Sequence, residues 1–177
     1  VFWKRFLPVR DGFYDGAALI ENQNLKLGSS RIDFTFTLYD GAGVILDQKS
    51  GNTYVYPSER ALLYVPNLQA GNREPAQIEL KINQIPWTHM NPQNGLNLDI
   101  VRKSFENEPH PIVALTIKNK SLFEEQGLEF YVLLVRADGN TYAASRTVTD
   151  GFAGGEERQI LFTWPTSSFE NPEKIEV

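Results

Sequence analysis

The sequence predicts an all-β fold made of two tandem β-sandwich domains. Two observations carry this prediction. First, short runs of alternating apolar and polar residues, typical of half-buried strands, recur along the 177-residue chain between turn residues such as Gly, Asp and Asn. Second, the later half of the chain repeats the earlier half. No segment has the periodicity of a helix longer than about one turn.

The internal repeat consists of short matches that keep their order and nearly the same offset. Chance matches would not stay collinear, so the chain contains two copies of one domain. The matched pairs are 20–22 with 117–119, 32–38 with 128–134, and 75–80 with 172–177.

The repeat also sets the domain boundaries. We predict a first domain at 1–85, a linker at 86–96, and a second domain at 97–177 that is a divergent repeat of the first. Pro86 and Pro92 stand in the linker together with several turn residues, and proline makes a short linker semi-rigid.

Each copy contains about seven short strand candidates, which is the number typical of an immunoglobulin-like sandwich. The alternation of Ile32, Phe34, Phe36 and Leu38 with polar residues gives the clearest strand, and Asp40 starts a hairpin turn after it. The expected strands are 2–9, 15–20, 32–39, 44–46, 52–56, 61–65 and 77–82 in the first copy, and 98–105, 112–117, 128–135, 141–143, 145–148, 159–164 and 174–177 in the second. The predicted fold is therefore two tandem immunoglobulin-like β-sandwich domains.

One motif in the first copy resembles a known family. Phe36, Leu38, Tyr39 and Asp40 spell FxLYD, and Asn22 lies at the end of an earlier strand. This pattern resembles the FxLYD domain, a family of small Ig-like modules of bacterial and archaeal envelope proteins. The second copy keeps the asparagine but replaces FxLYD. The resemblance implies structural roles for these residues and a membrane-anchored protein, with the anchor in a segment that precedes Val1.

Composition and motifs exclude several kinds of function. The net charge of −5 disfavours nucleic-acid binding, and the lack of cysteine removes disulfides and thiolate chemistry. The two histidines, His89 and His110, do not accompany a nucleophile motif, and no phosphate-binding loop occurs. We therefore predict no catalytic residue, no cofactor and no metal site. No apolar run in the chain is long enough to span a membrane.

The function expected from these features is a non-enzymatic, extracytoplasmic ectodomain that acts as a structural, spacer or protein-binding module of a cell-envelope protein. Its partner would be another envelope protein or a second copy of the chain. The alternative is a carbohydrate-binding or hydrolase-like accessory protein, because paired carboxylates cannot be recognised from sequence spacing.

Two groups of residues are candidates for interaction. In the strand at 128–135 the face opposite the core carries Tyr131, Leu133 and Val135, where alternation predicts polar residues. We expect these three side chains to be covered within the chain or to form a partner surface. Trp87, in the linker, is expected to pack between the two domains, with a ligand platform as the alternative.

Overall fold

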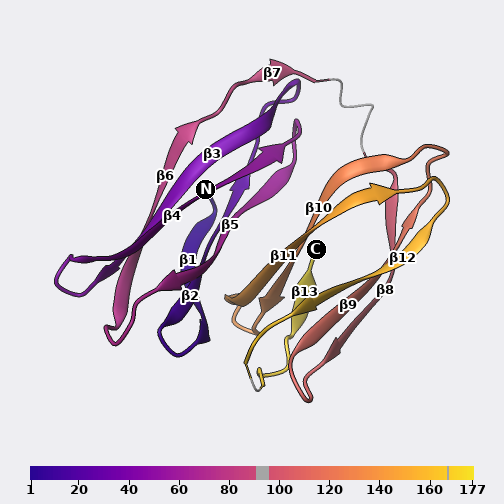
Figure 1. Cartoon of the computed structure of the whole chain (residues 1–177). Coiled ribbons are helices and arrows are strands. Elements are labelled where there is room, and N and C mark those ends of the chain that lie inside the picture. Colours follow the sequence, from indigo (N-terminus) through magenta and orange to yellow (C-terminus); the bar gives the residue numbers. More distant parts are fainter. Residues whose placement is uncertain (91–95, 167) are drawn as a thin grey trace. The chain divides into compact units, whose positions relative to one another are not determined.

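The computed structural model describes residues 1–90, 96–166 and 168–177 of the chain. Strands joined by turns form antiparallel sheets throughout this part, and it contains no helix, so the fold is all-β as predicted (Figure 1). The chain divides into two compact units, Val1–Asn94 and Gly95–Val177. We describe each unit separately.

The first unit contains two antiparallel sheets. One sheet has the order β1-β2-β5, and the other has the order β4-β3-β6, with the short β7 also paired to β3. The strands are β1 (Trp3–Arg10), β2 (Phe13–Glu21), β3 (Leu27–Asp40), β4 (Ile45–Val55), β5 (Arg60–Gln69), β6 (Pro75–Gln84) and β7 (Thr88–His89).

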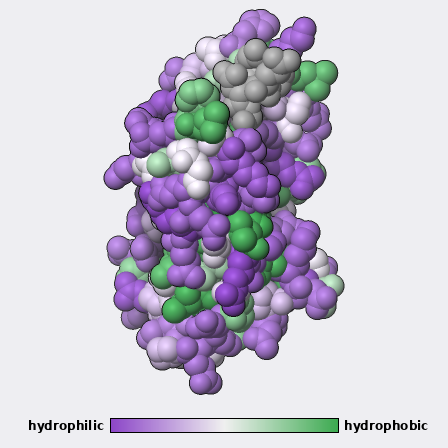
Figure 2. Space-filling model, turned by 90° about the vertical axis from the view of Figure 1, so that its right-hand side faces the viewer, coloured by the Kyte–Doolittle hydropathy of each residue, from purple (hydrophilic) through white to green (hydrophobic). Residues whose placement is uncertain are grey.

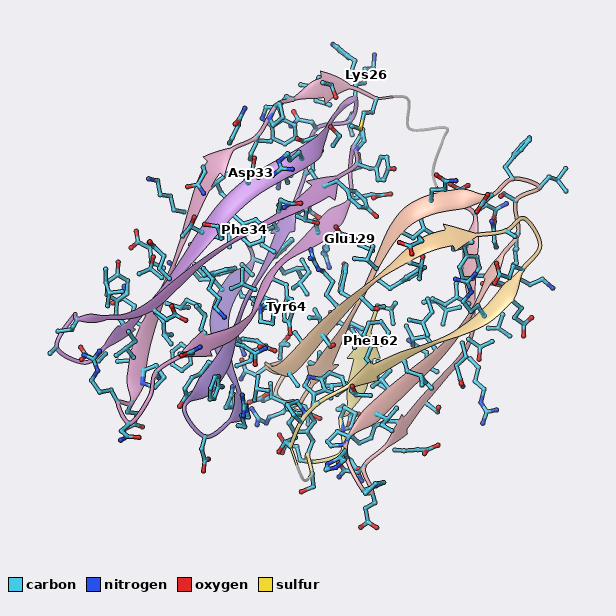
Figure 3. All side chains as sticks on the ribbon, viewed as in Figure 1. Lys26, Asp33, Phe34, Tyr64, Glu129 and Phe162 are labelled. Atoms are coloured by element: carbon cyan, nitrogen blue, oxygen red, sulfur yellow. The ribbon has the colours of Figure 1, made fainter. Side chains whose placement is uncertain are left out.

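Side chains from both sheets of the first unit form one hydrophobic core. Ile32, Phe34, Phe36 and Leu38 of β3 are fully buried, so the predicted inward face of this strand is confirmed. The rings of Phe34 and Phe36 meet edge to face, with centroids 5.7 Å apart, and Phe34 is labelled on β3 in Figure 3. Leu63 of β5 completes the core from the opposite sheet. The unit thus has the two-layer arrangement of a sandwich.

The second unit repeats this pattern of strand pairing. Its sheets have the orders β8-β9-β12 and β11-β10-β13, and β8 to β13 therefore correspond in order to β1 to β6 of the first unit. This is the result that an internal duplication predicts. The strands are β8 (Leu98–Glu106), β9 (Ile112–Asn119), β10 (Glu125–Val135), β11 (Thr141–Phe152), β12 (Glu157–Thr163) and β13 (Lys174–Glu176).

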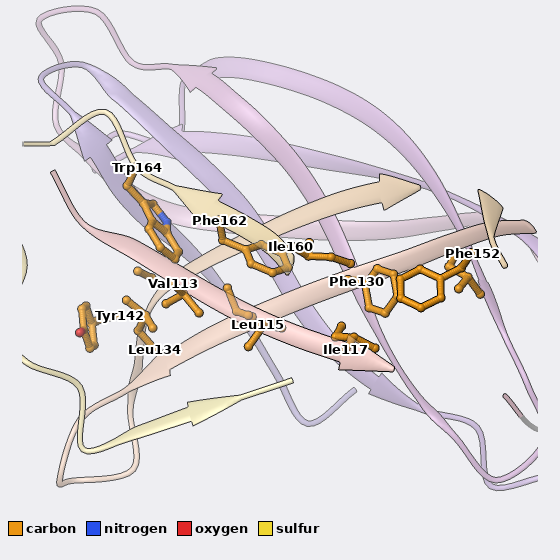
Figure 4. Packing of buried hydrophobic residues seen from close by; sticks show 13 residues of the cluster. Val113, Leu115, Ile117, Phe130, Leu134, Tyr142, Phe152, Ile160, Phe162 and Trp164 are labelled. Atoms are coloured by element: carbon orange, nitrogen blue, oxygen red, sulfur yellow. The ribbon is translucent and has the colours of Figure 1, made fainter. Parts of the chain in front are cut away.

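The core of the second unit also contains side chains from both of its sheets (Figure 4). Val113, Leu115 and Ile117 project from β9, and Phe130 and its alternate neighbours project from β10. Trp164 is buried, and its indole N–H donates to the carbonyl oxygen of Ala144 at 3.0 Å. Trp164 is therefore part of the core of this unit.

Two pairs of expected strands are single strands in the structure. The segments 44–46 and 52–56 belong to β4, and 141–143 and 145–148 belong to β11. The polar residues 47–50 of β4 pair with β3 along the edge of the sheet, where one face of the strand is exposed to water. The alternation pattern therefore predicts a break at 47–50, although the backbone pairing continues through these residues.

Part of the predicted linker belongs to the first unit. Thr88 and His89 form β7, which pairs with Gly28 and Leu27 of β3. Gly28 permits this approach, because a Cβ atom there would lie 2.5 Å from the sulfur of Met90. The linker residues 91–95 lie outside the described part of the chain.

Candidate functional site

A loop between β9 and β10, residues 120–124, is held by a buried asparagine. Asn119 ends β9 and is fully buried. Its side-chain amide donates to the carbonyl oxygens of Phe123 at 2.9 Å and Phe152 at 3.0 Å, and its Oδ1 accepts the backbone N–H of Ser121 at 2.9 Å. Asn119 thus satisfies backbone groups where the strand turns, which is a structural role.

Further contacts fix the course of the same loop. The Ser121 hydroxyl donates to the carbonyl oxygen of Phe123 at 2.8 Å. The same hydroxyl oxygen accepts the backbone N–H of Phe123 at 3.2 Å. Gly154 of the neighbouring loop lies directly against this backbone, since a Cβ atom there would be 2.5 Å from the carbonyl carbon of Leu122. The loop therefore has a defined backbone that is supported from both sides.

This ordered loop presents two large apolar side chains to solvent. Leu122 is 91% exposed and Phe123 is 76% exposed. Each of these side chains would gain hydrophobic free energy if it were buried against another apolar surface. We call Leu122 and Phe123 the leucine tip of the second unit.

The first unit has the same construction at the equivalent loop, residues 22–26. Asn22 is buried and donates from its side-chain amide to the carbonyl oxygens of Leu27 at 2.6 Å and Tyr56 at 3.0 Å. Its Oδ1 accepts the backbone N–H of Asn24 at 3.1 Å. Leu25 is 73% exposed and forms the leucine tip of this unit.

Sequence reasoning identified the two asparagines but missed the two leucine tips. The available signal was a leucine three residues after each asparagine, in Asn22–Leu25 and again in Asn119–Leu122. Whether such a leucine can contact a partner depends on the exposure of its side chain, which the sequence pattern alone does not give.

Acidic residues follow the tip of the second unit in the chain and also occur in the neighbouring loop that contains Gly154. Glu124 and Glu125 follow Phe123 directly in the chain. Glu156 accepts the backbone N–H of Ala153 at 2.8 Å and pairs with Arg158, and these contacts, the backbone hydrogen bond first, lower the pKa of Glu156 below its usual range. These contacts favour the ionised form of the Glu156 carboxylate.

The face of the molecule drawn in Figure 2 is mostly hydrophilic. Figure 2 shows one face of the molecule, on which hydrophobic residues form separate patches rather than one continuous area. Separate exposed apolar residues are normal for proteins. The leucine tips differ from them because the same position is exposed in both repeats.

A surface pocket lies beside the asparagine loop of the first unit. Its volume is about 410 Å³. The lining residues are Val1, Phe2, Glu21, Asn22, Gln23, Asn24 and Trp87. The guanidinium of Arg60 lies over the Phe2 ring, 4.6 Å from its centroid, and is 3.6 Å from the Glu21 carboxylate. The pocket thus combines two aromatic rings with amide and carboxylate groups.

Trp87 is therefore placed at this pocket of the first unit, with its side chain partly exposed. The expectation that it packs between the two domains concerns their relative placement and stays a prediction.

Tyr131, Leu133 and Val135 lie outside the core of the second unit. The core side chains of β10 are Leu128, Phe130, Val132 and Leu134, so the three candidates occupy the alternate positions. Leu133 and Val135 are nevertheless buried, and Tyr131 is half-buried. They are not a solvent-exposed patch, and their role in binding a partner stays a prediction.

Within 1–90, 96–166 and 168–177, no three side chains of the His, Asp and Glu types gather closely enough to hold a metal ion. The same residues contain no helix with the length and apolar character needed to cross a bilayer.

Comparison with known proteins adds no relative to this description. No protein-family model matches the chain, and no curated protein matches it. The resemblance of the first copy to FxLYD modules stays a prediction based on the motif residues.

Proposed function

We propose that this chain is a non-enzymatic, extracytoplasmic protein-binding module of a cell-envelope protein, composed of two tandem immunoglobulin-like domains. The matching strand order of the two units and the two-sheet core of each support this architecture. The FxLYD-like motif around Phe36 and Asp40 supports an envelope location.

The observation that carries the proposal is the leucine tip of the second unit. Burying a leucine or phenylalanine side chain in a partner contributes about 1.5–3 kcal/mol each. Because hydrogen bonds and Gly154 already fix the loop backbone, binding does not have to order the loop. Leu122 and Phe123 together can therefore anchor a weak or moderate complex, with Leu25 as a second contact point.

The partner that fits this tip is a protein with an apolar pocket and a basic rim. Anionic membrane surfaces attract clusters of lysine and arginine. Here the tip is followed by Glu124 and Glu125, and the net charge of the chain is −5. Both features oppose binding to anionic lipids and complement a positively charged protein surface.

Cross-linking in the native cell tests this proposal. A photoreactive amino acid replaces Phe123 in the full-length protein, and the cross-linked product is identified by mass spectrometry. We expect one defined protein at position 123. The same amino acid at Leu161, which is 54% exposed on β12, is the control and should not give that product.

Two cross-linking outcomes contradict the proposal. Cross-linking to lipid alone would make the tip a membrane contact, and equal products from positions 123 and 161 would remove its specificity.

Labelling of lysines in intact cells with a membrane-impermeant reagent tests the location. Protection of all lysines until the cells are lysed would contradict an extracytoplasmic protein.

A further inference from the structure

We propose that the pocket beside Trp87 in the first unit binds a neutral saccharide. The pocket shares the asparagine loop with Leu25, but Leu25 does not line it. The site adds a ligand to the protein-binding function proposed above. The pocket volume of about 410 Å³ lies within the range of about 300–1,000 Å³ that is usual for small-molecule sites.

The aromatic side chains supply the apolar part of this recognition. Trp87 is 44% exposed and Phe2 is 53% exposed, and both line the pocket. Exposed aromatic rings present a flat apolar face with a negative quadrupole, which attracts the polarised C–H groups on the face of a sugar ring. Trp87 is held near the pocket by the segment that leads into β7, where Thr88 and His89 pair with β3.

Polar groups of the asparagine loop supply the hydrogen bonds. Gln23 and Asn24 are exposed and line the pocket, and their amides can both donate to and accept from hydroxyl groups. The side-chain N–H of Asn24 donates to Asn22 at 3.0 Å, which orients the amide of Asn24. Asn22 itself is committed to backbone carbonyl oxygens and shapes the loop rather than contacting the ligand.

Arg60 makes a neutral ligand more favourable than a cation. A pair of aromatic rings beside a carboxylate can also form a cage for a quaternary ammonium group. In this pocket, however, the Arg60 guanidinium already lies over the Phe2 ring and 3.6 Å from the Glu21 carboxylate. The positive charge that such a cage would bind is thus provided by the protein, and a second cation would be repelled.

The equivalent loop of the second unit does not reproduce this site. By the repeat alignment, Lys118 and Lys120 stand at the positions of Glu21 and Gln23. The carboxylate and the amide are replaced by ammonium groups, so saccharide binding is expected in the first unit alone.

Titration followed by NMR tests the inference. The probes are the trimer of N-acetylglucosamine and maltotriose as neutral saccharides, and choline as a cation. We expect at least one of the two saccharides to shift the indole N–H resonance of Trp87 in a saturable way. Choline should cause no saturable shift. The variant Trp87→Ala identifies that resonance by its loss. It should also weaken binding at least about tenfold, measured through the amide of Asn24, whereas Trp87→Phe should keep most of the affinity.

Paired substitutions distinguish this pocket from the leucine tip of the second unit. Gln23→Ala with Asn24→Ala should weaken saccharide binding, whereas Leu122→Ser with Phe123→Ser should leave it unchanged. The inference is overturned if neither saccharide causes a saturable shift up to about 20 mM, which exceeds the millimolar range of weak complexes. Tighter binding of choline, or equal binding by Trp87→Ala and the unaltered chain, would also overturn it. A failure of this site leaves the cross-linking result at Phe123 unaffected.

Discussion

Asn119 shows how one buried side chain can determine a loop. Its amide satisfies the carbonyl oxygens of Phe123 and Phe152, while its Oδ1 accepts the N–H of Ser121. Without it the hydrogen bonds to the Phe152 carbonyl oxygen and from the Ser121 N–H are lost, and the Phe123 carbonyl oxygen keeps only the hydroxyl of Ser121. We predict that Asn119→Ala lowers the free energy of unfolding of the second unit by about 1–3 kcal/mol.

Urea unfolding measures this effect. Asn97→Ala, at an exposed asparagine of the same unit, serves as the control and should change stability by less than about 0.5 kcal/mol. Equal effects of the two substitutions would show that the Asn119 side chain does not support the loop.

Asp15 gives a prediction on pH dependence. Its carboxylate accepts the hydroxyl of Tyr64 at 2.5 Å and the N–H of Asn67 at 2.9 Å, but burial outweighs these bonds and raises the pKa of Asp15 above its usual value. The folded state therefore holds the proton more tightly than the unfolded state does. Stability contributed by this group is present below the unfolded pKa, and it is lost as pH rises through the raised folded pKa.

Asp15→Asn should remove this dependence, because the amide does not ionise. The stability of the unaltered chain minus that of the variant should fall as pH rises from about 4 to about 7. Urea unfolding at several pH values in this range measures the difference. A difference that stays constant, or that grows with pH, would mean that the Asp15 pKa is not raised by burial.

At the scale of elements, the middle of β4 depends on a glycine. A Cβ atom at Gly51 would lie 2.8 Å from the ring of Phe34, which is fully buried in the core of the first unit. We predict that Gly51→Ala destabilises this unit by about 1–3 kcal/mol, because the ring cannot move without disturbing the packing.

Gly41 provides the matched substitution. It lies in the turn before β4, and a Cβ atom there meets nothing within 4 Å. Gly41→Ala should therefore change the thermal midpoint little, while Gly51→Ala lowers it. If the two variants melt at the same temperature, the close approach of Phe34 to β4 is wrong.

Alternation predicted some strands well and others poorly. The inward face of β3, from Ile32 to Leu38, could be predicted because one face of the strand is buried and the other is polar. β4 and β11 could not be predicted at full length, because backbone pairing along a sheet edge does not require an apolar residue at every second position. The hairpin at Asp40 was predictable, since its carboxylate accepts the N–H groups of Ala42 and Val44.

The candidate sites were less predictable than the strands. The sequence pointed to Trp87 and to the two asparagines, but the exposure of Leu25 and Leu122 depends on the course of their loops. The pocket likewise joins Phe2, Glu21 and Trp87 from separate parts of the chain. Such proximity arises from strand pairing and has no signature in local spacing.

For the whole molecule, we predict that the two units fold independently of each other. Each unit has its own core and its own two sheets. When residues 1–94 and 95–177 are expressed separately, each should give a dispersed NMR spectrum and a cooperative unfolding transition. An unfolded spectrum from either piece would show that its core is insufficient without the rest of the chain.

The central claim is that each unit holds an exposed leucine on an ordered loop. Backbone ¹⁵N relaxation of the whole chain tests this claim most directly. We predict order parameters of about 0.85 for residues 119–123 and 22–25, similar to those of the neighbouring strands, because the asparagine side chains fix these loops. Order parameters below about 0.6 in both loops would contradict the account, since Leu25 and Leu122 would then be carried by flexible segments and would not form a preorganised contact.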